Sequence, residues 1–262
     1  MRDSPACRQP NTKLIFSETP ANPTLTLTDI PAVSALAKSK GIPHVVDSTF
    51  ATPIIQRPIE LGADLVIQST TKFYDGHNMT VGGAVVCATK ELHEQIKHMQ
   101  NVHGNIMSPQ NAFYTLQTTK TLGLRIAQQS ATAMKIAQFL EKHPAVDVVR
   151  YPGLDSHPQK ALADAQHLNG VHGSMLWFEV KGGSESGRIM MNSIQRPWSL
   201  CENLGAIESI CTCPSVMTHA NMLEEDRLKV GITDGFVRIS CGLEDPEDLI
   251  ASMKQSLDAL GY

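Results

Sequence analysis

Ala63-Asp-Leu-Val-Ile-Gln-Ser-Thr-Thr-Lys72 is an apolar run that ends in a cluster of hydroxyl groups and one amine. A short apolar run of this kind predicts a buried strand, here one that stops at Ser69, Thr71 and Lys72. A lysine in a partly desolvated pocket has a lowered pKa and can form a Schiff base with a carbonyl group. A lysine at a solvated strand end is the alternative, and the rest of the sequence decides between the two.

Strand-like and helix-like segments alternate on both sides of this run. We predict short strands at residues 13–16, 44–47, 65–67 and 83–86. A helix that begins at Thr28 or Asp29 and ends at Gly41 separates the first two, and further helices are expected at 90–99 and 121–142. Continuous apolar strands are typical of a mainly parallel sheet that is covered on both faces, which places the first part of the chain in the α/β class.

The pattern changes after the long helix at 121–142, which we expect to bridge two domains. Strands are predicted at 146–149, 174–180 and 235–240, the first of them at a sheet edge. The last segment, 246–260, is an amphipathic helix with acidic residues near its N-terminus, where they stabilise the helix dipole. The sequence therefore predicts two domains, an α/β part at 1–122 and an α+β part at 123–262.

Composition excludes several classes of partner. The chain has 262 residues, 42% of them hydrophobic, and a formal net charge of −4, so it should be globular without a basic surface for nucleic acid or an anionic membrane. No stretch approaches the roughly 18 apolar residues of a membrane span, and the first residues lack a signal peptide's apolar core. Six scattered cysteines suggest reduced thiols, and Cys211-Thr-Cys213 is too closely spaced for a common zinc half-site. We expect a cytoplasmic protein without a bound metal.

Polar groups gather where the predicted strands end. Asp47 ends one strand, and Ser69, Thr71 and Lys72 end another. Ligands of parallel sheets bind at the carboxyl ends of the strands, so one edge would combine a carboxylate, two hydroxyls and an amine. Pyridoxal phosphate needs all of these, because its aldehyde takes the lysine, its protonated ring nitrogen needs an acid, and its phosphate needs hydrogen-bond donors. The residues therefore point to pyridoxal phosphate as the cofactor.

Five segments carry a family resemblance that runs from about Lys13 to the C-terminus. They are Phe16-Ser-Glu-Thr-Pro-Ala-Asn-Pro-Thr24, Val45-Val-Asp-Ser-Thr-Phe-Ala-Thr-Pro53, Leu61-Gly-Ala-Asp-Leu-Val-Ile-Gln-Ser-Thr-Thr-Lys-Phe-Tyr-Asp-Gly-His77, Tyr151-Pro-Gly-Leu-Asp-Ser-His-Pro158 and Val237-Arg-Ile-Ser-Cys-Gly-Leu-Glu-Asp245. The chain resembles the trans-sulfuration (Cys/Met metabolism) family of pyridoxal-phosphate enzymes, which includes cystathionine γ-synthase, cystathionine γ-lyase, methionine γ-lyase and homoserine sulfhydrylases. The resemblance implies the PLP-dependent transferase fold type I, with an incomplete, mainly parallel sheet of the large domain followed by a smaller α+β C-terminal domain.

The same resemblance implies a role for six residues. Lys72 is the Schiff-base lysine, Asp47 the partner of the ring nitrogen, Ser69 and Thr71 phosphate ligands, Asn22 a partner of the ring hydroxyl, and Arg238 the holder of the substrate α-carboxylate. Three of them have a structural alternative. Asp47 would otherwise cap a helix, Arg238 would form a structural ion pair, and Asn22 would only form a turn beside its prolines.

These assignments imply γ-elimination or γ-replacement on cystathionine, a related sulfur amino acid or a homoserine ester. The substrate amine would displace Lys72, whose freed amine would then move protons. Glu202 matches a position at which synthases and γ-lyases resemble one another in carrying an acid, which would attract the distal amino group of cystathionine, whereas methionine γ-lyases tend to be apolar there. Asn203 stands where the family has a serine that bonds to the lysine or the substrate, and the stretch Gly76-His-Asn-Met-Thr-Val-Gly-Gly83 also departs from the family pattern.

The chain starts at what corresponds to the middle of the family's cofactor domain. The preceding family segment supplies a ring-stacking tyrosine, backbone amides for the phosphate and a Tyr/Arg pair lent to the neighbouring subunit. We therefore expect a fragment that binds the cofactor weakly, from a protein whose full-length form is a homo-oligomer, a dimer of dimers, and acts on a small-molecule amino acid. A non-catalytic remnant is one alternative. Another interprets Ser69-Thr-Thr-Lys72 as the S-x-x-K motif of an acyl-enzyme, but K-T-G and S-D-N do not occur in the sequence.

Overall fold

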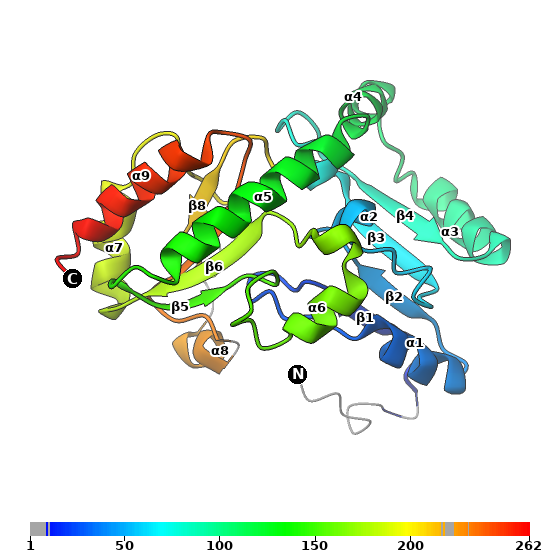
Figure 1. The fold of residues 1–262 in the computed structure, drawn as a ribbon. Helices are drawn as coiled ribbons and strands as arrows, with labels where there is room; N and C mark the ends of the chain where they lie inside the picture. The colour runs from blue at the N-terminus through cyan, green and yellow to red at the C-terminus, as the bar shows by residue number, and fades with distance from the viewer. Residues whose placement is uncertain (1–8, 10, 216, 218–222, 230) are drawn as a thin grey trace.

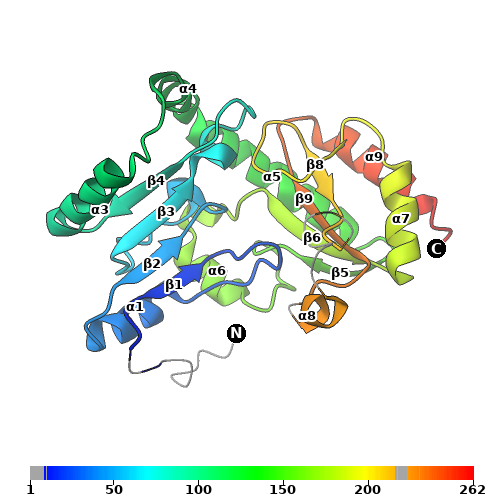
Figure 2. The same ribbon diagram turned by 180° about the vertical axis from the view of Figure 1, so that it is seen from behind.

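Two β-sheets and one long helix between them organise the chain (Figure 1). The computed structural model describes residues 9, 11–215, 217, 223–229 and 231–262. Figure 2, from behind, shows the first sheet and the second sheet on opposite sides of the molecule, with the C-terminal helix on the outer side of the second.

The first sheet has the strand order β1-β2-β3-β4. Its strands are β1 (Ile15–Glu18), β2 (His44–Asp47), β3 (Leu65–Ser69) and β4 (Gly83–Cys87). The first three are parallel, and the register pairs Glu18 with Asp47 and Asp47 with Ile67. The strand predicted at 13–16 begins two residues later, and the one predicted at 44–47 has the bounds of β2. Because the parallel strands end at nearly the same level, their carboxyl ends form one edge.

The helices of this half vary in how much they bury. They are α1 (Ile30–Ser39), α2 (Thr52–Ile55), α3 (Lys90–His103) and α4 (Pro109–Thr119). The Asp29 carboxylate caps α1 by accepting from the main-chain amide of Ala32, as its sequence predicts. The expectation that every strand is covered on both faces is wrong for β4, because Val85 and Val86 are 45% and 48% exposed. This strand lies at the end of the sheet and pairs antiparallel with β3.

The second sheet has the order β5-β6-β9-β8-β7. Its strands are β5 (Val146–Arg150), β6 (Met175–Val180), β7 (Ser199–Leu200), β8 (Ile210–Thr212) and β9 (Phe236–Ser240). The remaining helices are α6 (Lys160–Gln166), η3 (Leu168–Gly170), α7 (Gly183–Ser193), α8 (Glu224–Lys229) and α9 (Pro246–Asp258). The edge position predicted for β5 is confirmed, and antiparallel pairing dominates, as expected of an α+β unit.

The long helix α5 (Leu122–Leu140) packs against both halves. Its first turns contribute Leu122 and Ile126 to an apolar cluster that also contains Phe73. Its later turns contribute residues such as Ile136 and Leu140 to the core around the second sheet. Its buried residues extend from the first turn to the last, and each fully buried side chain of this size contributes about 1.5–3 kcal/mol to stability. Neither α5 nor any other helix of the described residues combines the length and the apolar character that crossing a membrane requires.

Candidate functional site

Lys72 lies just past the carboxyl edge of the first sheet. Strand β3 runs directly into a short π-helical turn, η2 (Thr70–Tyr74), in which Lys72 leaves helical geometry at φ −95° and ψ −124°. Turns of this kind occur frequently at functional sites. The half-buried side chain donates from Nζ to Oδ1 of Asn203 at 2.6 Å. The lysine side chain therefore contacts a distant part of the chain. The alternative of a solvated lysine at a strand end does not agree with the structure.

A buried arginine of α5 anchors the main chain around Lys72. Arg125, only 4% exposed, donates to the carbonyl oxygens of Phe73 at 2.7 Å, Tyr74 at 3.3 Å and Thr118 at 3.0 Å. These bonds fix η2 to the start of α5. The sequence analysis missed this residue, although an arginine on the apolar side of a helix is a recognisable signal of a buried polar contact.

A glycine allows the loop that carries Asn203 to reach Lys72. Gly205 has φ +82°, and a Cβ there would lie 2.8 Å from the amide nitrogen of Phe73 and 3.0 Å from the carbonyl carbon of Lys72. Its own amide donates to Oγ of Ser240 in β9 at 2.9 Å. Only glycine combines this conformation with so close an approach of two main chains. The loop from the second sheet thereby rests directly on η2.

Arg238 meets the same loop from β9. It is 3% exposed, and its guanidinium donates from Nη1 to Oδ1 of Asn22 at 2.8 Å and from Nη2 to the main-chain oxygen of Asn203 at 3.2 Å. Burial lowers its pKa to about 10, so it stays cationic at neutral pH. No ion pair involves Arg238 among the described residues, so the structural alternative, an internal salt bridge, is not found there. A buried guanidinium without a carboxylate suits an anionic ligand.

The surroundings of Lys72 lower the pKa of its amine. Burial is the main cause, the positive charge of Arg238 adds to it, and the nearby thiol of Cys201 acts in the opposite direction. The neutral amine is the form that acts as a nucleophile or base. Lys72 therefore reaches its reactive form at a lower pH than an exposed lysine.

Asp47, Ser69 and Thr71 lie at the carboxyl edge of the first sheet, as the sequence predicts. The three side chains differ from one another in their hydrogen bonds. Oδ1 of Asp47 accepts from the amide of Thr49 at 3.0 Å, and Oγ1 of Thr49 accepts from the amide of Ser69 at 2.9 Å, which ties the ends of β2 and β3 together. The Thr71 hydroxyl accepts from the Gly82 amide at 3.0 Å and donates to the Gly82 carbonyl at 3.3 Å. The Ser69 hydroxyl has no such bond in the described part of the chain. A carboxylate, an amine of lowered pKa and a hydroxyl that is still able to bond fit the groups of pyridoxal phosphate.

Two other predicted residues have different surroundings. Asn22 follows β1, and its main-chain amide donates to Oε1 of Glu18 at 3.0 Å. Its side-chain oxygen accepts from Arg238. Burial and the charge of Asp47 raise the pKa of Glu18, a residue that the sequence analysis did not single out. Glu202 is exposed and makes no hydrogen bond or ion pair with the described residues. The structure therefore brings Lys72, Asn203, Arg238 and Asn22 into one bonded chain and leaves Glu202 beside it.

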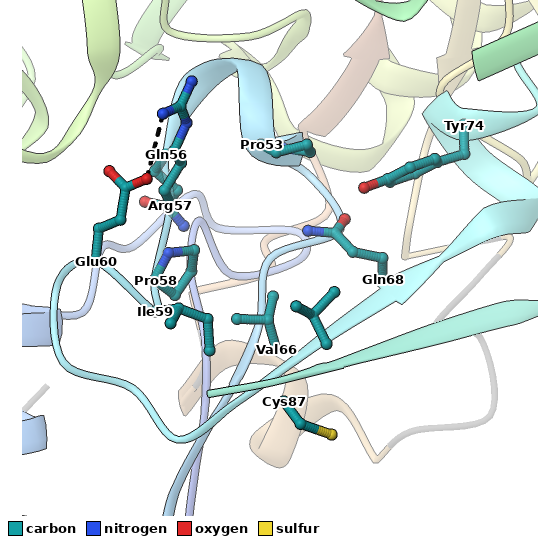
Figure 3. Close-up of a pocket in the computed structure, with 11 residues that line it drawn as sticks. Pro53, Gln56, Arg57, Pro58, Ile59, Glu60, Val66, Gln68, Tyr74 and Cys87 are labelled. Atoms are coloured by element: carbon teal, nitrogen blue, oxygen red, sulfur yellow. Dashed lines mark hydrogen bonds and ion pairs between the residues drawn. The ribbon is translucent and has the colours of Figure 1, made fainter. Parts of the chain in front are cut away.

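A separate cavity of about 280 Å³ lies on the face of β3 that carries Val66 and Gln68 (Figure 3). Successive strand residues point to opposite faces, so this is not the face of Ser69. Part of its polar wall is engaged in internal contacts, since Nη1 of Arg57 lies 3.2 Å from Oε1 of Glu60 and the Gln56 side-chain NH₂ donates to the Thr19 carbonyl at 2.7 Å. The side-chain oxygens of Gln56 and Gln68 have no partner among the described residues. None of the predicted site residues lines the cavity. Chemistry therefore places the candidate site at Lys72 and not here.

Comparison with known proteins gives consistent matches along the chain. The family model described as Cys/Met metabolism PLP-dependent enzyme matches residues 2–258. Cystathionine γ-lyase of Bacillus subtilis (strain 168) is 44% identical over 250 residues, covering 95% of this chain and 65% of the relative. L-methionine γ-lyase of Porphyromonas gingivalis (strain ATCC BAA-308 / W83) is 44% identical over 257 residues, covering 97% and 64%. The chain thus spans about 65% of the length of the curated relatives it matches.

Solved structures agree with these relatives. Cystathionine γ-lyase from Lactobacillus plantarum, complexed with L-serine, has a TM-score of 0.93 at 36% identity, covering 98% of this chain and 66% of that one. Cystathionine γ-synthase from Xanthomonas oryzae pv. oryzae, in complex with cystathionine, has a TM-score of 0.91 at 41% identity, covering 95% and 64%. The fold class predicted from the sequence, PLP-dependent transferase fold type I, is confirmed.

Proposed function

This chain belongs to the Cys/Met metabolism PLP-dependent enzyme family, and we propose that it carries out γ-elimination or γ-replacement on a sulfur amino acid or a homoserine ester. The observation that carries the proposal is the meeting of Lys72 and Arg238 on one residue. Lys72 binds the side-chain oxygen of Asn203, and Arg238 binds its main-chain oxygen. The amine of Lys72, with its lowered pKa, and the buried guanidinium of Arg238 are therefore close together, because both bind Asn203. This arrangement suits a substrate that carries both an amino group and a carboxylate.

Each residue has a role that follows from its chemistry. When bound, pyridoxal phosphate supplies an electron sink to a substrate amine. Lys72 would attach the cofactor through its amine and, once free, take and return protons at the substrate carbon atoms. Arg238 would bind the α-carboxylate through two parallel hydrogen bonds. Asp47 would keep a proton on the ring nitrogen, and the hydroxyls of Ser69 and Thr71 would donate to the phosphate, the latter after exchanging its bonds to Gly82. Asn22 would bond to the ring hydroxyl.

Glu202 supports cystathionine over methionine as the substrate. An exposed carboxylate one residue from Asn203 would attract the distal ammonium group of cystathionine, which methionine lacks. Methionine γ-lyase activity is the second candidate, since the Porphyromonas gingivalis relative of that name is as similar as the cystathionine γ-lyase of Bacillus subtilis. Changing Glu202→Gln should therefore lower kcat/KM for cystathionine by several-fold and leave methionine turnover unchanged. Equal losses for both substrates would remove the assigned role.

Covalent attachment and turnover test the function directly. The chain is purified with pyridoxal phosphate, treated with borohydride, digested, and searched by mass spectrometry for the cofactor on each lysine. We expect it on Lys72 in the unchanged chain and in Lys97→Ala, a matched variant on the exposed surface of α3, and its loss in Lys72→Ala. Formation of 2-oxobutanoate from cystathionine or methionine, or of cystathionine from a homoserine ester and cysteine, then identifies the reaction. Attachment without any turnover would favour a remnant that has kept the fold but not the activity.

We also propose that the protein acts as a homo-oligomer in the cytoplasm. The five described cysteines are free thiols, which suits a reducing compartment. Sedimentation of the purified chain with and without pyridoxal phosphate tests the oligomeric state, and a monomer under both conditions would contradict the proposal.

A further inference from the structure

We propose that Asn78 is a positioning residue for Lys72, which it orients through the side chain of Asn203. This deepens the proposed function, on which its catalytic meaning rests, because it adds a residue that does not itself touch the lysine. The relevant contact is a hydrogen bond from Nδ2 of Asn203 to Oδ1 of Asn78, at 2.9 Å.

Three hydrogen bonds link Lys72 to the protein surface. Lys72 donates to Oδ1 of Asn203 at 2.6 Å, Asn203 donates to Asn78, and Nδ2 of Asn78 donates to Oε2 of Glu208 at 3.4 Å. The last bond is long and exposed, so it is the weakest of the three. The chain of contacts runs from η2 to the loop after β7 and back to the loop after η2, which joins segments that are 125 to 131 residues apart in the sequence.

The two ends of this chain fix the direction of both amides. A lysine ammonium offers only donors, and a carboxylate offers only acceptors. Asn203 must therefore turn its oxygen toward Lys72, which leaves its NH₂ group for Asn78. Asn78 must accept with its oxygen and can donate only toward Glu208. The contact with Asn78 favours the same orientation of Asn203, because it accepts from the NH₂ group and so leaves the amide oxygen to face Lys72.

The backbone of Asn78 provides a competing explanation that the test has to separate. Its φ is +57°, a left-handed conformation in which asparagine is favoured. A residue retained only for this turn would have no effect on Lys72 beyond stability. Glycine and aspartate both tolerate the same conformation, so they change the side chain without adding backbone strain. Asn78→Gly removes the acceptor for Asn203, and Asn78→Asp keeps it.

The experiment measures the reactivity of the Lys72 amine in the full chain without cofactor. The protein is labelled with acetic anhydride over a range of pH, and mass spectrometry compares acetylation of Lys72 with that of Lys90, whose side chain is 84% exposed. Arg238 and Cys201, the charged or titratable groups that act on the Lys72 amine, are unchanged in every variant. A hydrogen-bond acceptor stabilises the ammonium form, so its loss moves the labelling profile to lower pH.

Asn78→Gly should shift the Lys72 profile to lower pH and raise labelling at fixed neutral pH by roughly a few-fold, the size of one ordinary hydrogen bond. Asn78→Asp should leave the profile in place or move it to higher pH. In an Asn203→Ala background, Asn78→Gly should have no further effect. An unshifted profile in Asn78→Gly, or the same shift with Asn203 removed, would overturn the proposal. Because no cofactor is present, failure of pyridoxal phosphate to attach would refute the proposed function and leave this result intact.

Discussion

Replacing Gly205 by alanine tests whether the close approach of two main chains builds the site. Gly205 lies at φ +82°, where an L-residue with a Cβ is disfavoured by about 1–2 kcal/mol. The added Cβ would also lie 2.8 Å from the amide nitrogen of Phe73, 3.0 Å from the carbonyl carbon of Lys72 and 3.3 Å from its Cα. These are main-chain atoms that cannot move aside as a flexible side chain would.

The two costs have to be added. Overpacking of a tight contact costs about 1–3 kcal/mol, so Gly205→Ala should lower the free energy of unfolding by about 2–5 kcal/mol in total. Relief of the clash requires the loop to retreat from η2, and this would lengthen the bond from Lys72 to Asn203. We therefore expect the variant to lose stability and to weaken the hydrogen bond between Lys72 and Asn203.

Gly104 provides the matched control. It has φ +70° at the C-terminus of α3, and a Cβ there would meet nothing within 4 Å. Gly104→Ala should therefore pay only the conformational cost of about 1–2 kcal/mol. Urea unfolding of both variants, followed by circular dichroism, measures the difference. Equal losses in the two variants would refute the reasoning, because they would mean that the contact with Lys72 is not tight.

Two further predictions concern pH. The folded state raises the pKa of Glu18, so this group holds more protons folded than unfolded just above its usual pKa, and stability falls as pH rises through that window. Glu18→Gln should therefore stabilise the protein at neutral pH but not below pH 4.5. Thermal melts of the variant and the unchanged chain at neutral pH and below pH 4.5 check this. A lower melting temperature of the variant at neutral pH would contradict it. Burial lowers the pKa of His167 to about 3, so the unfolded chain takes up its proton first and stability falls as pH drops below 6.5. In His167→Gln, the loss of unfolding free energy between neutral pH and about pH 5 should be smaller by about 2 kcal/mol, as measured by urea unfolding. The same dependence of unfolding free energy on pH in both proteins would contradict this prediction.

Local signals in the sequence were sufficient for several elements. Proline and serine flank the β-branched run of β2, and the Asp29 cap marks the start of α1, so both were placed correctly. Helix α4 was missed, and it contributes little to the core, since Thr118 is its only buried residue. Its start did have a signal: Ser108 precedes Pro109, and the serine hydroxyl accepts from the amide of Asn111 at 3.2 Å.

For the candidate site, too, some features follow from local sequence signals and others do not. Asp47, Ser69 and Lys72 follow from strand ends, because parallel strands bring their carboxyl ends to one edge. The contacts among Lys72, Asn203 and Arg238 have no local signal, since Lys72 and Asn203 are 131 residues apart and follow strands of different sheets. The family resemblance pointed to these residues individually. The bonds between them depend on how the two halves pack, which no pattern along one segment encodes.

Packing next to the site explains why this long-range contact can persist. Phe73 follows Lys72 in the sequence, Leu204 follows Asn203, and both side chains are buried in one apolar cluster with Ile126 of α5. A hydrogen bond to a charged group contributes about 1.5–3 kcal/mol, and burial of each of these three side chains contributes about as much. The apolar contacts together therefore outweigh the polar one. Lys72 and Asn203 meet because their neighbours are driven together, and the hydrogen bond then selects the orientation of the two side chains.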